Sequence, residues 1–276
     1  MACEGHINPE QKGIREMQAS HARSTVSAVF DDPNLVSCAG LVPVLELAAS
    51  CGLAGLVGQT LTLPKAGGVN AHLKVPALVA GMVAGADSIQ DMDLLRHGAM
   101  SRLFGGVRAP STLGTFLRSF SFGHVRQLDA VAATLLARLA QRTPLLPAGD
   151  VIAFIDIDDT IRATYGYTKQ GAGYGYSGVK GINALLATIS TPAAAPVIAA
   201  TRLRKGSSNS ARGAARLVAD ALLTAARAGV GGLVILRADS AYYNHDVIAA
   251  AIRHGARFSP HRPDGPGRAA RDHSDR

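Results

Sequence analysis

Apolar residues follow two different spacings along this chain, and the spacing changes near residue 148. Before that point apolar residues recur every three or four positions, which is typical of amphipathic helices. After it they form short runs or alternate with polar residues, which is typical of strands. Pro144, Pro147 and Gly149 mark the change. The pattern predicts a helical N-terminal domain over 27–148 and an α/β domain over 149–259, between a disordered leader (1–26) and an unstructured tail (260–276).

The elements that we expect can be given by their ranges. Helices are predicted over 41–56, 77–86, 110–120, 125–139, 210–228 and 243–254. Strands are predicted over 151–155, 182–189, 196–203, 233–236 and 257–259. The first three strands follow one another without a helix, so they are expected to form hairpins.

Composition narrows the class of partner. The chain has 276 residues, with 28 Lys and Arg against 20 Asp and Glu and a pI of about 9.8, so a polyanion such as nucleic acid is the favoured partner. Three scattered cysteines exclude a disulfide framework and a cysteine zinc site. No apolar run is long enough to predict a membrane span, so a cytoplasmic location without membrane contact is expected.

Candidate chemistry begins in the stretch Phe154–Thr160, where an apolar run is followed by three carboxylates within four positions. Side chains two apart on a strand share a face, so Asp156 and Asp158 should lie together and Asp159 opposite or in a turn. Neighbouring carboxylates raise one pKa or recruit a cation, which makes a metal site one interpretation. The alternative is that the strand ends here and the carboxylates are solvated around a turn.

Two enzyme classes fit this stretch. It resembles the first motif of haloacid-dehalogenase-like phosphatases, which would make Asp156 the phosphoryl nucleophile, Asp158 the general acid/base and Mg²⁺ the cofactor. Against that class, the following residues predict hairpins and provide no later acidic pair. The predicted order of elements instead matches a ribonuclease-H-like fold, in which the first and fourth strands are neighbours. Asp158 and Asp239 would then meet and could hold metal ions for phosphodiester chemistry.

Two further patterns in the sequence each allow two interpretations. The stretch Gly173–Gly178 formally matches a dinucleotide fingerprint, but a strand-like segment follows where a helix is required, so we predict a turn with close backbone approach. The helices over 110–139 could form a helix-turn-helix reader or an ordinary helical hairpin. Candidate phosphate contacts are Lys169, Lys180, Arg202, Arg204 and Lys205, with Arg118 and Arg126 on the helical pair.

Longer motifs then suggest a family. They include Asp156–Thr160, Gly166–Gly178, Asn183–Ala187, Arg202–Gly206 and Arg237–Tyr243, and upstream Asp31–Val36, Gly85–Ile89, Leu94–Gly98 and Pro110–Leu117. Together they resemble the DDE transposases of bacterial insertion sequences, and within these the thirteen-eighty family. The resemblance implies catalytic carboxylates at Asp158 and Asp239, with Asp156 as a further candidate metal ligand. It also implies Mg²⁺ or Mn²⁺ as cofactor, double-stranded DNA of element ends as partner, a nucleoid location and a homodimer as a candidate assembly.

The chain departs from this family in two respects. The third carboxylate is expected from a Glu on a later helix within a Tyr, Arg, Glu, Lys pattern, but the only glutamates are Glu4, Glu10, Glu16 and Glu46. After Ser259 the sequence changes to a polar, Pro- and Gly-containing stretch. We therefore expect a truncated or frameshifted transposase without strand cleavage or transfer, and an unfinished sheet that exposes apolar surface. A non-catalytic DNA-binding fragment is the remaining alternative.

Overall fold

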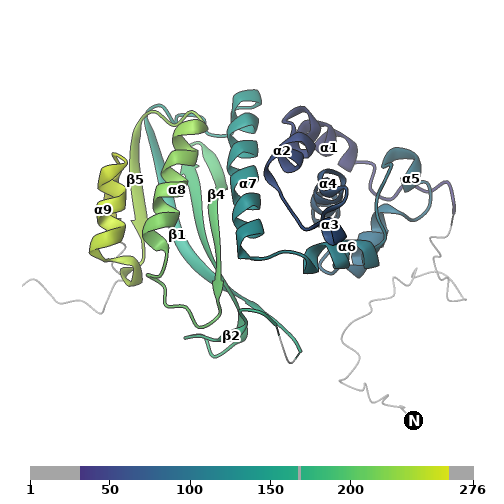
Figure 1. The fold of residues 1–276 in the computed structure, drawn as a ribbon. Helices are drawn as coiled ribbons and strands as arrows, with labels where there is room; N and C mark the ends of the chain where they lie inside the picture. The colour runs from purple at the N-terminus through teal and green to yellow at the C-terminus, as the bar shows by residue number, and fades with distance from the viewer. Residues whose placement is uncertain (1–31, 167–168, 261–276) are drawn as a thin grey trace, which may run out of the picture.

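The computed structural model describes residues 32–166 and 169–260, so the predicted leader and all but the first residue of the predicted tail lie outside the described residues. The fold is mixed α/β. Helices make up its first part, and a six-stranded mixed sheet with two helices makes up its second part (Figure 1).

The first part contains only helices, which pack through two apolar clusters. Their bounds are α1 Leu41–Ser50, α2 Leu53–Thr60, α3 Lys65–Gly68, α4 Ala71–Val83, the 3-10 helix η1 Gln90–Leu95, α5 Met100–Leu103, α6 Pro110–Arg118 and α7 Phe122–Arg142. The prediction of one helix over 41–56 is wrong, because Gly52 adopts a positive φ of 78° and separates α1 from α2. The helix predicted from residue 77 already begins at Ala71 and contains Pro76.

Helix α7 lies between the other helices of the first part and the sheet (Figure 1). Val131 contributes to the apolar cluster with α2 and α4. On the sheet side, the Asp129 carboxylate accepts a hydrogen bond from the Thr201 hydroxyl at 2.6 Å. Burial raises the pKa of Asp129 despite this bond and the neighbouring Arg126. The helix therefore joins the two parts through one apolar and one polar side.

The sheet has the order β4-β3-β1-β5-β6, and the short β2 pairs with the start of β3. The strands are β1 Ile152–Ala163, β2 Gly173–Tyr174, β3 Lys180–Thr191, β4 Ala194–Lys205, β5 Leu233–Ala238 and β6 Arg257–Pro260. The pairs β1–β3 and β3–β4 are antiparallel, whereas β1–β5 and β5–β6 are parallel. The predicted hairpins and the predicted neighbourhood of the first strand and the strand before Asp239 are confirmed.

Strand β1 is longer than the sequence pattern indicated. It continues through the carboxylates to Ala163, because β3 pairs with it from Phe154 opposite Ser190 to Ala163 opposite Gly181. The prediction that the carboxylates stand at a strand end is therefore wrong. They lie in mid-strand, where the pleat decides which way each points.

One face of the sheet is covered by α8 Ala214–Arg227 and α9 His245–Arg253 (Figure 1). Alternate residues of β1, namely Ala153, Ile155 and Ile157, are buried in the core with both helices. We call this side the helix face. The residues between them lie on the opposite side, the open face, where side chains such as Ile198 and Leu203 remain exposed.

The glycine-rich stretch before β3 does not form a dinucleotide loop. A Cβ atom on Gly175 would overlap the carbonyl oxygen of Gly206, and one on Gly206 would overlap the carbonyl oxygens of Gly181 and Gly173. The predicted close backbone approach is confirmed, because three segments meet here with no room for side chains.

Within residues 32–166 and 169–260, no single helix has the length and apolar composition to cross a membrane, although the bent pair formed by α1 and α2 meets these criteria when taken together.

Candidate metal and DNA-binding site

The site is built where β1 and β5 run parallel. Their register ends with Ile157 opposite Ala238, so Asp158 and Asp239 are the next residues on two hydrogen-bonded neighbours. Adjacent strands in a sheet lie about 5 Å apart, which puts these carboxylates within reach of a shared cation. The sequence predicted this pair from topology.

Both carboxylates are exposed, and each has one oxygen engaged by the backbone. The Asp158 Oδ1 atom accepts a hydrogen bond from the Asp159 N–H at 2.7 Å. The Asp239 Oδ1 atom accepts one from the Ala241 N–H at 2.7 Å and so caps the short 3-10 helix η2 Ser240–Tyr242. The structure gives neither residue a cationic side-chain partner among the described residues. One oxygen of each carboxylate is left for a ligand.

Asp156 lies on the open face with Asp158, but both of its carboxylate oxygens already accept hydrogen bonds. Arg237 lies opposite it on β5 and donates from Nε to Oδ1 and from an Nη atom to Oδ2, both at 2.6 Å. The guanidinium also lies 4.4 Å from the centre of the Phe154 ring. The hydrogen bonds to Asp156 raise the pKa of Arg237 above its ordinary value. With both oxygens bound to a cation, Asp156 is poorly placed as metal ligand or nucleophile.

Asp159 points to the helix face, as the period-two pattern predicted, and forms an ion pair with Arg204. An Nη atom of Arg204 lies 2.6 Å from Asp159 Oδ2, and the side chains are 4% and 24% exposed. The amide of Asn183 donates to the same oxygen at 2.9 Å. Arg204 was predicted to contact DNA phosphate, and this is wrong, because its guanidinium is buried and its donors are used inside the protein.

The three clustered carboxylates therefore differ in charge balance. Asp156 is neutralised by Arg237 on the open face, and Asp159 by Arg204 on the helix face. Asp158 is the member of the cluster without an arginine in the described structure. This distribution favours Asp158 as the metal ligand, a choice that the sequence alone left open.

Tyr242 is buried in the core cluster with β1 and was not singled out from the sequence. It is 2% exposed, and its hydroxyl makes no hydrogen bond within ordinary geometric limits in the described part of the chain. Burial, followed by the negative charges of Asp159 and Asp158, raises the pKa of the Tyr242 phenol. It ends η2, three positions after Asp239, so the segment after β5 returns to the core that β1 shares.

The pleat of the strands determines which of the basic residues predicted to contact DNA lie on the open face. Lys205 lies opposite Ile182, and Ile182 lies opposite Arg162, so the three form a row across β4, β3 and β1 on the open face. Arg162 and Lys205 are exposed, and Arg162 was missed in the sequence because it stood alone. Lys180 lies on the same face, and its Nζ atom donates to the Gly166 carbonyl at 3.1 Å.

The remaining residues predicted to contact DNA differ in their exposure. Arg202 is half-buried on the helix face, where burial lowers its pKa. Lys169 is exposed in the glycine-rich segment, and Arg118 is exposed at the end of α6. Arg126 belongs to α7 and forms ion pairs with Asp129 on the same helix at 2.7 Å and with Asp220 on α8 at 2.8 Å. Arg126 therefore joins the two parts of the molecule and is not presented to a ligand.

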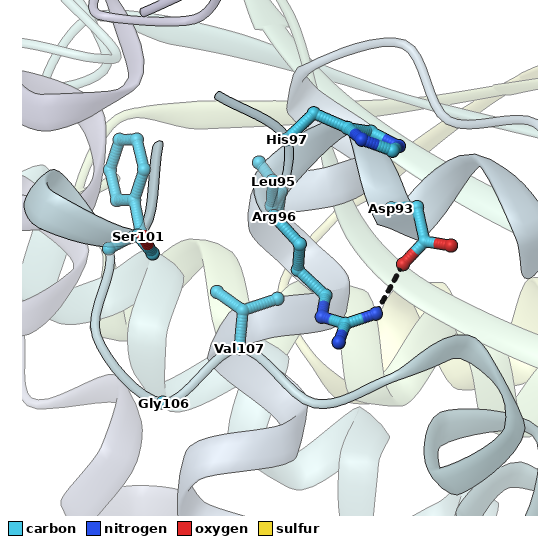
Figure 2. A pocket seen from close by; sticks show the side chains of 8 residues that line it. Asp93, Leu95, Arg96, His97, Ser101, Gly106 and Val107 are labelled. Carbon is cyan, nitrogen blue, oxygen red and sulfur yellow. Dashed lines mark hydrogen bonds and ion pairs between the residues drawn. The ribbon is translucent and has the colours of Figure 1, made fainter. Parts of the chain in front are cut away.

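A separate cavity of about 400 Å³ lies among the helices of the first part and is lined by Leu95, His97, Ser101 and Val107 (Figure 2). In Figure 2 the Arg96 side chain extends across it to Asp93, and the two form an ion pair of 2.6 Å. The cavity belongs to the segment Leu94–Gly98 noted in the sequence. Its lining includes Ser101 of α5, and α5 lies on the opposite side of α7 from β1 (Figure 1).

The sequence model of the family described as transposase DDE domain, group 1, matches residues 18–259. Searching the curated proteins gave no significant match. Among solved structures, the chain is similar to the Mos1 strand transfer complex, with 14% identity, a TM-score of 0.24 and coverage of 68% of this chain and 57% of that chain.

A second similar structure is the Mos1 transposase paired-end complex with left transposon end, with 14% identity, a TM-score of 0.24 and coverage of 68% and 58%. A third is the pre-cleavage Mos1 transpososome, with 12% identity, a TM-score of 0.23 and the same coverage. The chain thus spans less than two thirds of the length of these proteins.

Proposed function

Because the chain belongs to the family of group 1 transposase DDE domains, we propose that residues 149–259 form the ribonuclease-H-like catalytic region of an insertion-sequence transposase. The observation that carries this proposal is the parallel pairing of β1 with β5, which brings Asp158 beside Asp239. The quoted motifs further support membership of the thirteen-eighty family.

The carboxylate pair fits a divalent metal ion. Mg²⁺ is commonly held by one or two carboxylates together with substrate phosphates, and Asp158 and Asp239 each keep a free oxygen. Within the part that the structure describes, no group of three or more His, Cys, Asp or Glu residues is placed to hold a metal. Asp158 and Asp239 would therefore hold Mg²⁺ or Mn²⁺ jointly with DNA phosphate. A bound metal would polarise the phosphate and promote attack by an oxygen nucleophile.

These 276 residues contain no Glu after Glu46, so they do not provide the third carboxylate that the family resemblance implies. We propose that the protein made of these residues binds metal and DNA without cutting or joining strands. The test is to incubate it with Mn²⁺ or Mg²⁺ and element-end DNA. Bound but intact DNA is expected, whereas metal-dependent nicking or strand transfer that disappears in Asp158→Asn would contradict the proposed inactivity.

The DNA backbone is proposed to follow the open face. Arg162 lies four residues beyond Asp158 on β1, or about 13 Å along the strand, which corresponds to about four nucleotide steps of one DNA strand. With one phosphate at Asp158 and Asp239, a phosphate about four nucleotides along the same strand would thus lie within reach of Arg162 and Lys205.

The salt dependence of DNA binding tests this path. Replacing Arg162 and Lys205 by Gln should lower the slope of log affinity against log salt concentration by about 1.8, since each lost phosphate contact contributes about 0.9. Arg216→Gln on the exposed side of α8 is the matched control and should leave the slope unchanged. Equal slopes for the double variant and the control would refute the path. Absence of DNA binding by the unmodified protein would refute the proposed function.

A further inference from the structure

Arg204 connects three segments on the helix face. Its Nε atom donates to Asn183 Oδ1 at 2.8 Å, and one Nη atom donates to Asp159 Oδ2 at 2.6 Å. The other Nη atom shares its two hydrogens among three carbonyl oxygens in the segment before α8, those of Asn209, Ser210 and Arg212, at 3.1, 2.9 and 2.8 Å. A single buried guanidinium thus fixes β1, β3 and the start of α8 relative to one another.

Asp159 connects Arg204 on the helix face with Asp158 on the open face. Its carboxylate is held by Arg204 and Asn183 on the helix face. Its backbone N–H donates to Asp158 Oδ1 on the open face at 2.7 Å. The orientation of that N–H depends on the backbone of Asp159, which is restrained by the ion pair with Arg204 on the helix face. Asp158 therefore receives a hydrogen bond whose direction is set by a residue that it does not touch.

We propose that Arg204 is a positioning residue for Asp158. It acts through Asp159 in two ways: it cancels the charge of the neighbouring carboxylate, and it holds the Asp159 N–H so that one oxygen of Asp158 is fixed and the other faces the ligand. This inference rests on the proposed function, since it concerns the metal-binding role of Asp158. Lysine cannot replace Arg204 here, because a single ammonium cannot reach acceptors spread around a planar fork.

The test compares Arg204→Lys with Arg126→Lys in the full 276-residue protein. Arg126 is a matched control, because it too combines carboxylate ion pairs, in this case with Asp129 and Asp220, with a hydrogen bond to a backbone carbonyl, that of Thr201, but away from the carboxylate pair. Mn²⁺ binding is measured by electron paramagnetic resonance of the free ion at a temperature where both variants are folded. Amide exchange of Asp159 is measured without metal by NMR on protein labelled with ¹⁵N-aspartate.

Arg204→Lys is expected to weaken Mn²⁺ binding about 10-fold, the lower end of the effect of residues that support metal ligands, and to accelerate Asp159 exchange about 10-fold. Arg126→Lys should lower the melting temperature without changing either quantity. If Arg204→Lys does not fold, Asn183→Ala removes the other side chain that holds Asp159 and should produce smaller changes in the same direction.

Unchanged Mn²⁺ affinity and Asp159 exchange in Arg204→Lys, with Mn²⁺ binding lost in Asp158→Asn, would overturn the positioning role and leave the proposed function standing. If Arg126→Lys also weakens Mn²⁺ binding and accelerates Asp159 exchange, the effect is a general structural one, and the positioning role is likewise overturned. Wild-type protein that binds no Mn²⁺ would refute the metal site and the inference together.

Discussion

Asp156 and Asp158 both lie on the open face of β1, but only Asp156 forms an ion pair with Arg237 in the described structure, so their roles can be distinguished by experiment. In Asp156→Asn the side chain keeps its shape but loses its charge, so the paired hydrogen bonds at 2.6 Å are weakened and Arg237 remains a cation. Asp158→Asn makes the same chemical change two residues away, where no arginine is bound in the described structure.

The expected loss of stability in Asp156→Asn is small. The two side chains are 38% and 45% exposed, so solvent screens the pair, and about 0.5–1 kcal/mol is typical of such a site. For a domain of this size that corresponds to a fall of about 1–4 °C in melting temperature. The unpaired Arg237 charge would weaken metal binding at Asp158 by less than about 1 kcal/mol, or about fivefold. Asp158→Asn should abolish metal binding with little effect on melting.

The assay is Mn²⁺ titration combined with thermal melting of both variants, with Asp220→Asn as control. Asp220 also accepts hydrogen bonds from arginines but lies on α8, so its replacement should affect melting alone. Hydrolysis of p-nitrophenyl phosphate with Mg²⁺ is measured in parallel and should be absent. Phosphatase activity that is lost in Asp156→Asn, or metal binding that depends on Asp156 more than on Asp158, would refute the reasoning.

Three further predictions concern the rest of the molecule. Gly206→Ala should lower the free energy of unfolding by about 1–3 kcal/mol, because its Cβ would overlap neighbouring backbone, whereas Gly231→Ala, with nothing near its Cβ, should be nearly neutral in the same denaturant titration. Arg126→Met should lower the melting temperature and leave the salt slope of DNA binding unchanged, and a reduced slope would restore its predicted role as a phosphate contact. Sedimentation should show concentration-dependent association through the open face, which Ile198→Lys should reduce and Val44→Lys on α1 should not.

Much of the α/β part could be predicted from the alternation of apolar residues. Each strand from β3 to β6 was expected, and the parity of Asp156, Asp158 and Asp159 correctly assigned their faces, because the side-chain period of a strand is two. The order of elements then predicted that Asp158 and Asp239 would be neighbours. These are features that local pattern and connection rules determine.

Partners across strands could not be predicted in this way. Whether Arg237 or Arg204 meets a carboxylate depends on strand register, which is set by hydrogen-bonded pairing along the ladder and not by either segment alone. Arg204 stands in the basic run Arg202–Lys205, where the sequence predicts contacts with DNA phosphate, yet the pleat turns it to the helix face. The length of β1 was underestimated for the same reason, since charged residues in mid-strand require counterions that come from distant segments.

The two ion pairs on β1 also make its position difficult to alter. Asp156 is held by β5 from one side of the sheet and Asp159 by β4 from the other, so sliding β1 by one residue would break both pairs and bury Asp158 without a partner. Such a displacement exchanges the faces of all three carboxylates at once. Although they differ in no chemical respect, the three aspartates are not interchangeable, and a mutation that removes one cannot be rescued by its neighbours.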